Sequence, residues 1–157
     1  MKILKPILLL SLLALLFSCR HTVSPLDLDF SSLTEPRARW QAYKLNNYTI
    51  EQQRVCFCIG PHGFVKLTVE NGKIVAGVEV ENGNDVPANQ LQYFQTVDQV
   101  FDWLEQEMER EVPLAKLEVE YHPRYGYPTS IAYDYSETIA DDELWISMRA
   151  LEAKGEK

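Results

Sequence analysis

The chain has 157 residues, the length of one domain, and 46% of them are hydrophobic, which is enough for a packed core and excludes a mostly disordered chain. Its net charge is −8 and its Lys and Arg residues form no cluster. Nucleic acid and an anionic lipid surface are therefore disfavoured as partners, because each phosphate contact needs a cation.

The first residues predict a cleaved export signal. Lys2 and Lys5 precede a run from Ile7 to Phe17 that contains only apolar residues and one serine, and small Ser18 follows it. This run is shorter than the roughly 20 residues that a permanent transmembrane helix needs. The order basic, apolar, small is typical of a signal peptide, which we place at residues 1–18.

Leu16-Phe17-Ser18-Cys19 resembles a bacterial lipobox, in which the cysteine is linked to diacylglycerol and becomes the first residue of the mature protein. The alternative is an ordinary signal peptide that is cut nearby. Lipidation of Cys19, with palmitate among the acyl chains, would hold the protein in the lipid bilayer. An aspartate directly after the lipidated cysteine would resemble an inner-membrane retention signal, but this position is Arg20. The expected location is therefore the periplasmic face of the outer membrane.

Removal of the signal peptide would lower the net charge to about −10, because Lys2 and Lys5 are lost with it. We expect residues 19–35 to form a lipidated tether, residues 36–151 a single domain, and residues 152–157 a polar tail. A short helix is predicted at the start of the domain, with Thr34 as its N-cap and Pro36 in its first turn.

The next segment, from Tyr48 to Ile59, is predicted to be extended and apolar on both faces at its end. Two further strands are expected around Asn71-Gly72, a strong hairpin signal. The inward rows expected for these two strands alternate along the chain: Val65, Leu67 and Val69 on the first, then Ile74, Ala76, Val78 and Val80 on the second.

Thr96 and Gln99 resemble a capping box, and the apolar residues behind them recur at helical spacing, from Val97 to Met108. Residues 115–135 predict two antiparallel strands joined by a turn at Pro123 and Gly126, where Gly126 takes a positive φ. The last apolar stretch, residues 144–151, fits either a strand or a short helix, and we favour the strand.

These elements predict an α+β fold: an antiparallel sheet of five to six strands with two helices on one face. The order of elements suggests a doubled αβββ arrangement, although no repeat is visible in the residues.

Several separated patterns occur together, namely Cys56-Phe57-Cys58, Thr96-Val97-Asp98 with Phe101, Gly126-Tyr127-Pro128-Thr129-Ser130-Ile131, and Asp141-Asp142-Glu143. With them the chain resembles an uncharacterised bacterial family of exported proteins and lipoproteins, a domain of unknown function, from about Trp40 to Leu151. The resemblance implies an exported protein and brings no established activity or ligand.

Cys56 and Cys58 are the most reactive pair. In an oxidising compartment two cysteines favour a disulfide, but residues i and i+2 on a flat strand lie about 6.5 Å apart, so a bulge or kink is needed. Two buried thiols are a second interpretation. A third is a copper or zinc site that includes His62 on the following turn, for which no fourth ligand is evident.

Asp134, Asp141, Asp142 and Glu143 are interpreted as a solvated acidic loop, with a calcium site or an acid–base pair as the alternative. Tyr125 and Tyr127 are candidates for a binding face, because tyrosine is favoured at interfaces, and Asp141, Asp142 and Glu143 are further candidates for that role. The sequence contains no catalytic signature. It thus favours a non-catalytic, lipid-anchored periplasmic module that binds a partner protein or another envelope component and needs no cofactor, with an enzyme ranked third. The runner-up is a redox or metal-handling lipoprotein that uses Cys56 and Cys58.

Overall fold

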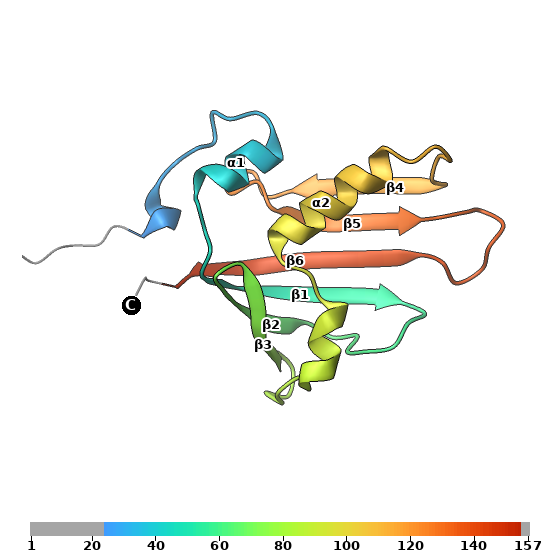
Figure 1. The fold of residues 1–157 in the computed structure, drawn as a ribbon, viewed down its shortest axis with the longest axis horizontal. Coiled ribbons are helices and arrows are strands. Elements are labelled where there is room, and N and C mark those ends of the chain that lie inside the picture. The colour runs from blue at the N-terminus through green and yellow to red at the C-terminus, as the bar shows by residue number, and fades with distance from the viewer. Residues whose placement is uncertain (1–23, 155–157) are drawn as a thin grey trace, which may run out of the picture.

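The structure is a computed structural model that describes residues 24–154. The predicted signal peptide and the lipidation site Cys19 lie outside these residues. Six strands form one antiparallel sheet in the order β3-β2-β1-β6-β5-β4, and two α-helices lie on one of its faces (Figure 1). The elements are η1 (Pro25–Asp27), α1 (Pro36–Ala42), β1 (Tyr48–Cys56), β2 (Val65–Glu70), β3 (Lys73–Glu79), η2 (Ala88–Tyr93), α2 (Val97–Met108), β4 (Lys116–Tyr121), β5 (Pro128–Asp134) and β6 (Leu144–Ala153).

The predicted α+β class, the strand count and the two helices are confirmed. The doubled αβββ order is present along the chain, but the two halves differ in space. The strands of the first half run outward from the centre, β1 to β3, whereas those of the second half run inward, β4 to β6. The central pair, β1 and β6, therefore joins the halves without making them copies of each other.

The hydrophobic core lies between the sheet and the two helices. The ring of Trp40 on α1 meets that of Tyr48 on β1 edge to face, with 5.5 Å between centroids. The backbone N–H of Val97 donates to the hydroxyl of Tyr48 (3.1 Å), so both helices are fixed to one strand. The predicted capping box at Thr96 and Gln99 is formed, and it defines where α2 begins.

The row of residues expected to face the core on β3 is wrong beyond its first member. Ile74 packs against the core, but Ala76, Val78 and Val80 are exposed, and Gly77 is buried instead. The register between β2 and β3 shifts between Thr68 and Val69, so an extra residue on β3 reverses the faces beyond it. A bulge of this kind leaves no mark in the alternation of a valine-rich sequence.

The end of β1 corrects a second expectation. The strand stops at Cys56, and the side chains of Phe57 and Ile59 are 85% and 77% exposed. The chain bends away from the sheet over residues 57–60, so the predicted apolar row continues past the last paired position into solvent.

Residues 24–35, which belong to the range expected to form the tether, are attached to the domain. Leu26 and Phe30 pack against the core, and the Arg124 guanidinium donates to the carbonyl oxygens of residues 26–28 at 2.9–3.2 Å. Thr34 is not the N-cap of α1. Glu35 takes that position without a side-chain cap, because the backbone is already extended there and Pro36 begins the helix.

The hairpin of β4 and β5 forms as predicted, with Gly126 at φ +80°. A Cβ atom at Gly126 would lie 2.3 Å from the carbonyl oxygen of Pro36. The first turn of α1 therefore packs directly against the backbone of this turn. Residues 144–151 are a strand, as we favoured, and β6 continues to Ala153, two residues into the expected polar tail. No helix within residues 24–154 is both long and apolar enough to cross a membrane.

Candidate functional site

Two loops meet at one end of the sheet and form what we call the tip: residues 57–64, between β1 and β2, and residues 135–143, between β5 and β6. They are neighbours because β1 pairs with β6, with Cys56 opposite Leu144 and Val55 opposite Trp145. Figure 1 shows both loops at the end opposite to η1. The tip combines two of the sequence-predicted site groups, the cysteine loop and the acidic loop.

The sulfur atoms of Cys56 and Cys58 form a disulfide, and the two Cα atoms are 5.2 Å apart. The bend that follows β1 supplies the kink that a flat strand lacks. The bond closes a ring of residues 56–58, from which the Phe57 side chain stands out into solvent. Val55 and Trp145, cross-strand partners next to the ring, are 44% and 47% exposed, so the tip carries several large apolar side chains.

The predicted metal ligands do not form a ligand set in this state. Both sulfurs are used in the disulfide, and His62 is exposed on the loop, where its carbonyl oxygen accepts from the Gln53 side chain at 2.8 Å. Within residues 24–154 no group of three or more His, Cys, Asp and Glu side chains is placed to hold a metal ion.

The acidic loop holds a carboxyl group that has no hydrogen-bond partner within residues 24–154. Both carboxylate oxygens of Asp142 are covered from solvent and make no hydrogen bond to any described residue. Desolvation, together with the nearby Asp134 and Glu143, raises the pKa of Asp142. Asp141 and Glu137 on the same loop are exposed, so the loop adds negative charge beside the disulfide-closed ring of residues 56–58 and its exposed apolar side chains.

Tyr125 and Tyr127, the tyrosines named as candidates for a binding face, are not part of the tip, and that role stays a prediction. They lie at the opposite end of the sheet, where Tyr127 is 3% exposed and Tyr125 packs against the core. The ring of His122 stacks on both, with centroid distances of 4.7 and 5.0 Å. Burial, followed by the charge of Tyr125, raises the pKa of Tyr127 to about 12, as expected for a core phenol.

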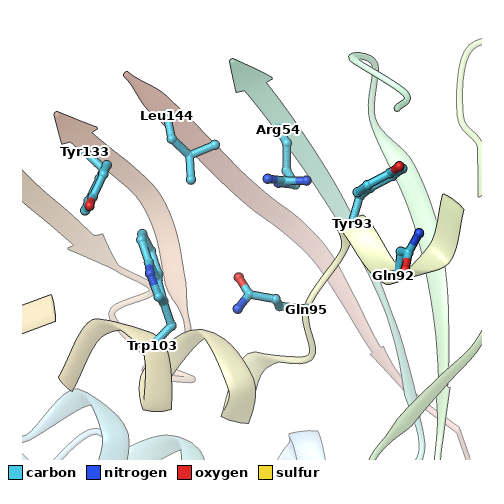
Figure 2. Close-up of a pocket in the computed structure, with 7 residues that line it drawn as sticks. All are labelled: Arg54, Gln92, Tyr93, Gln95, Trp103, Tyr133 and Leu144. Atoms are coloured by element: carbon cyan, nitrogen blue, oxygen red, sulfur yellow. The ribbon is translucent and has the colours of Figure 1, made fainter. Parts of the chain in front are cut away.

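A cavity of about 370 Å³ lies on the helix side of the sheet, between β1, β5, β6, η2 and α2. Figure 2 shows its lining, in which Arg54 extends from β1 toward Gln95 and the Trp103 ring stands up from α2 toward Tyr133 and Leu144. The residues that line it are Arg54, Gln92, Tyr93, Gln95, Trp103, Tyr133 and Leu144. No Asp or Glu is among them.

Arg54 differs from the other arginines of residues 24–154. Each of the others binds a carboxylate or a backbone carbonyl, whereas the Arg54 guanidinium has no hydrogen bond and no ion pair within this part of the chain; the partnered ones are Arg37, Arg39, Arg110, Arg124 and Arg149. Burial lowers the pKa of Arg54, and no acidic group offsets that effect. A half-buried cation without an acceptor is costly unless a ligand or water satisfies it.

Gln52 and Gln95 fix the wall of this cavity that faces α2. The side chain of Gln52, 1% exposed, donates to the carbonyl oxygen of Gln95 (3.1 Å) and accepts from its N–H (3.2 Å). The Gln95 backbone is held in this way, while its side-chain amide has no partner among the described residues and faces the cavity (Figure 2).

Sequence reasoning missed this cavity. Ile50 and Gln52 on β1 face the core, and Arg54 continues the same alternation. A cation at an inward strand position with no acidic residue beside it could have indicated the cavity. The other lining residues come from elements far apart in the chain, and nothing in their spacing indicates that they meet.

No curated protein and no solved structure matches this chain. A protein-family model does match: residues 32–153 fit DUF6174, a family of unknown function. The resemblance to an uncharacterised family is thereby confirmed, while the bacterial, exported and lipidated character that we attached to it stays a prediction. The chain belongs to DUF6174, whose family match covers the domain from just before α1 to the end of β6.

Proposed function

We propose that this protein is a lipid-anchored, non-catalytic module of the bacterial envelope that binds a partner protein through its tip. The observation that carries the proposal is the exposure of Phe57 and Ile59, at 85% and 77%, on a loop closed by a disulfide. Exposed large apolar side chains that lie together on a soluble domain are typical of an interaction site. A closed ring also lowers the entropy that Phe57 would lose on binding.

The position of the tip favours a protein over the membrane that would hold the anchor. The chain from Cys19 to Ser24 spans at most about 18 Å when extended. Because η1 is docked at the other end of the sheet, a lipidated Cys19 would hold that end near the bilayer (Figure 1). The nine residues of β1, at about 3.4 Å each, then separate the tip from it by about 30 Å.

The charge of the tip also favours a protein. Glu137, Asp141 and Glu143 lie on the loop beside the apolar ring, and an anionic lipid surface would repel them. A partner that presents basic side chains around an apolar pocket would complement both features. The expected partner is thus a periplasmic or envelope protein with such a surface.

The anchor is tested by Cys19→Ala in cells. We expect this variant to lose acyl labelling and to leave the membrane fraction or to stay unprocessed. Labelling and fractionation equal to those of the wild type would refute the lipid anchor and leave the tip hypothesis in place.

The partner is tested with a photoreactive amino acid at position 57 and, as a matched control, at the exposed Lys73, which begins β3 at the other end of the sheet. We expect a discrete cross-linked species from position 57 only, lost when Ile59→Ser is added. Equal cross-linking from both positions, or none from position 57, contradicts a binding tip.

A second candidate function is thiol–disulfide exchange, which the exposure of Cys58 favours. A thiolate of a partner dithiol would attack the Cys58 sulfur and release Cys56 as a thiolate. The second thiol of the partner would then attack the mixed disulfide, so that the partner is oxidised and both cysteines are reduced. Equilibration in glutathione buffers tests it: a disulfide that resists reduction at the envelope's redox poise excludes this role.

A further inference from the structure

We propose that the cavity around Arg54 is a binding site for a small organic carboxylate that carries a flat apolar group. This site is separate from the partner-binding tip, and either can fail without the other. The inference starts from Arg54, the arginine whose guanidinium has no acceptor anywhere in residues 24–154 although it is half-buried in a concave site.

The charge around the cavity selects an anion. The chain carries a net charge of −8, yet no lining residue of the cavity is Asp or Glu. Glu107 contacts one lining residue: its carboxylate accepts from the Tyr133 hydroxyl at 3.2 Å and is already paired with Arg110 at 2.9 Å. Asp102, next to Trp103 in the chain, is likewise paired with Arg37. The positive charge of Arg54 therefore remains available to a ligand.

The donors in the cavity favour a carboxylate over a more highly charged anion. A guanidinium presents two parallel N–H groups that match the two oxygens of a carboxylate. Arg54 is the single cation in the lining, so a dianion such as phosphate would stay half compensated. The Gln95 side-chain amide faces the same space and can donate to a carboxylate oxygen or accept from a neighbouring group (Figure 2).

The walls favour a flat apolar group on the ligand. Trp103 lies 5.4 Å from Tyr133, centroid to centroid, and Tyr93 on η2 lines the opposite side of the cavity (Figure 2). Aromatic side chains bind planar groups by stacking and by edge contacts. A volume of about 370 Å³ is near the lower limit for ligand pockets, which restricts the ligand to a small molecule or to the end of a chain.

The carboxylate can come from two sources, a free aromatic acid or the C-terminus of a peptide. The experiment uses purified residues 20–157 and titrates benzoate, the dipeptide Gly-Phe and its C-terminal amide, with inorganic phosphate as a further probe. Binding is followed by calorimetry and by the indole N–H resonance of Trp103, assigned with Trp103→Phe.

We expect at least one of the two acids, benzoate or Gly-Phe, to bind and to shift the Trp103 resonance, and phosphate to bind more weakly than that acid. If Gly-Phe binds, its amide should bind at least about tenfold more weakly. Binding of benzoate alone indicates a free acid as the ligand, and preference for Gly-Phe over benzoate indicates a chain terminus. No binding of either acid at about 10 mM, or phosphate binding tighter than both, overturns the proposal.

The matched variants are Arg54→Met and Arg149→Met. Both remove one positive charge, but Arg149 is paired with Glu51 at 2.7 Å on the other side of the sheet. We expect Arg54→Met to weaken carboxylate binding at least about tenfold, Arg54→Lys to lose part of it, and Arg149→Met to leave it unchanged. Equal binding by Arg54→Met and the wild type, with both folded by thermal melting, also overturns the proposal.

Discussion

The two ends of the sheet are built in opposite ways. At the turn end, formed by residues 122–127, α1 and η1, buried side chains and a buried glycine bring segments distant in sequence into direct contact. Arg39 there donates to the carbonyl oxygens of Leu33 and Pro123. At the tip, apolar and acidic side chains face solvent, and Asp142 lacks a partner among the described residues. The difference indicates that stability depends on the turn end and leaves the tip available for binding.

The largest effect is expected at Gly126. Gly126→Val introduces a β-branched residue at φ +80° and a Cβ atom 2.3 Å from the Pro36 carbonyl oxygen, so α1 must move. We expect a loss of about 3 kcal/mol or more in the free energy of unfolding, measured by urea melts. Two controls separate the causes. Gly72→Ala has the positive φ without the contact and should cost about 1 kcal/mol, and Gly63→Ala has neither and should cost less.

If Gly126→Val lost no more stability than Gly72→Ala, the contact with α1 would be unimportant. Stability would then not depend more on the turn end than on the tip, and the comparison would fail.

The next effect is expected at Gln52, which lies between the two ends. Gln52→Leu leaves the part-buried N–H and C=O groups of Gln95 without their partner, the buried Gln52 amide, and we expect a loss of about 1–3 kcal/mol in the free energy of unfolding. Because Gln95 lines the cavity, carboxylate affinity should fall as well. Urea melts and the benzoate titration measure the two effects. The control for stability is Gln53→Leu on the same strand, where the half-buried side chain donates only to the carbonyl oxygen of His62 on the loop; a loss as large in it would refute the role of the buried amide.

At the tip we expect a smaller effect from removing the disulfide. Cys56→Ala with Cys58→Ala opens a ring so short that its loop-closure entropy is worth about 1.5 kcal/mol at most. The urea midpoint should fall less than in Gly126→Val, while cross-linking from the photoreactive residue at position 57 should weaken because that position is no longer held outward by the ring. A larger loss of stability than in Gly126→Val would make the cysteine pair the main structural element and reverse the comparison.

The smallest effect is expected from Asp142→Asn, and it depends on pH. The raised pKa means that the folded state binds the proton more tightly than the unfolded state does, so stability falls as the pH rises from about 4 through the folded pKa. Asn has no charge to lose, so the variant should be more stable than the wild type at pH 7 and equal to it below about pH 4. Melts across this range measure the difference, with the low-pH points as the internal control. A variant that is less stable at pH 7 would show that the carboxylate has a stabilising partner.

The sequence by itself determined the features that rest on short-range chemistry. The capping box at Thr96, the turn at Asn71-Gly72 and the positive φ of Gly126 each depend on residues within one turn of chain, and all three are present. The inward rows of β2 and the alternation of β4 followed from the period of a strand. These signals sufficed for the α+β class, because each element's apolar face must be covered by another.

Only the tertiary structure decided the features that need distant segments to meet. The bulge in β3 depends on its pairing with β2, and the burial of Tyr127 depends on where α1 docks. The cavity needs Arg54, Tyr93, Trp103 and Tyr133 to converge from β1, η2, α2 and β5. Local sequence determines which face of an element is apolar. The long-range contacts between elements determine which side chain is left without a partner. The unpartnered guanidinium of Arg54 is the basis of the proposed binding site.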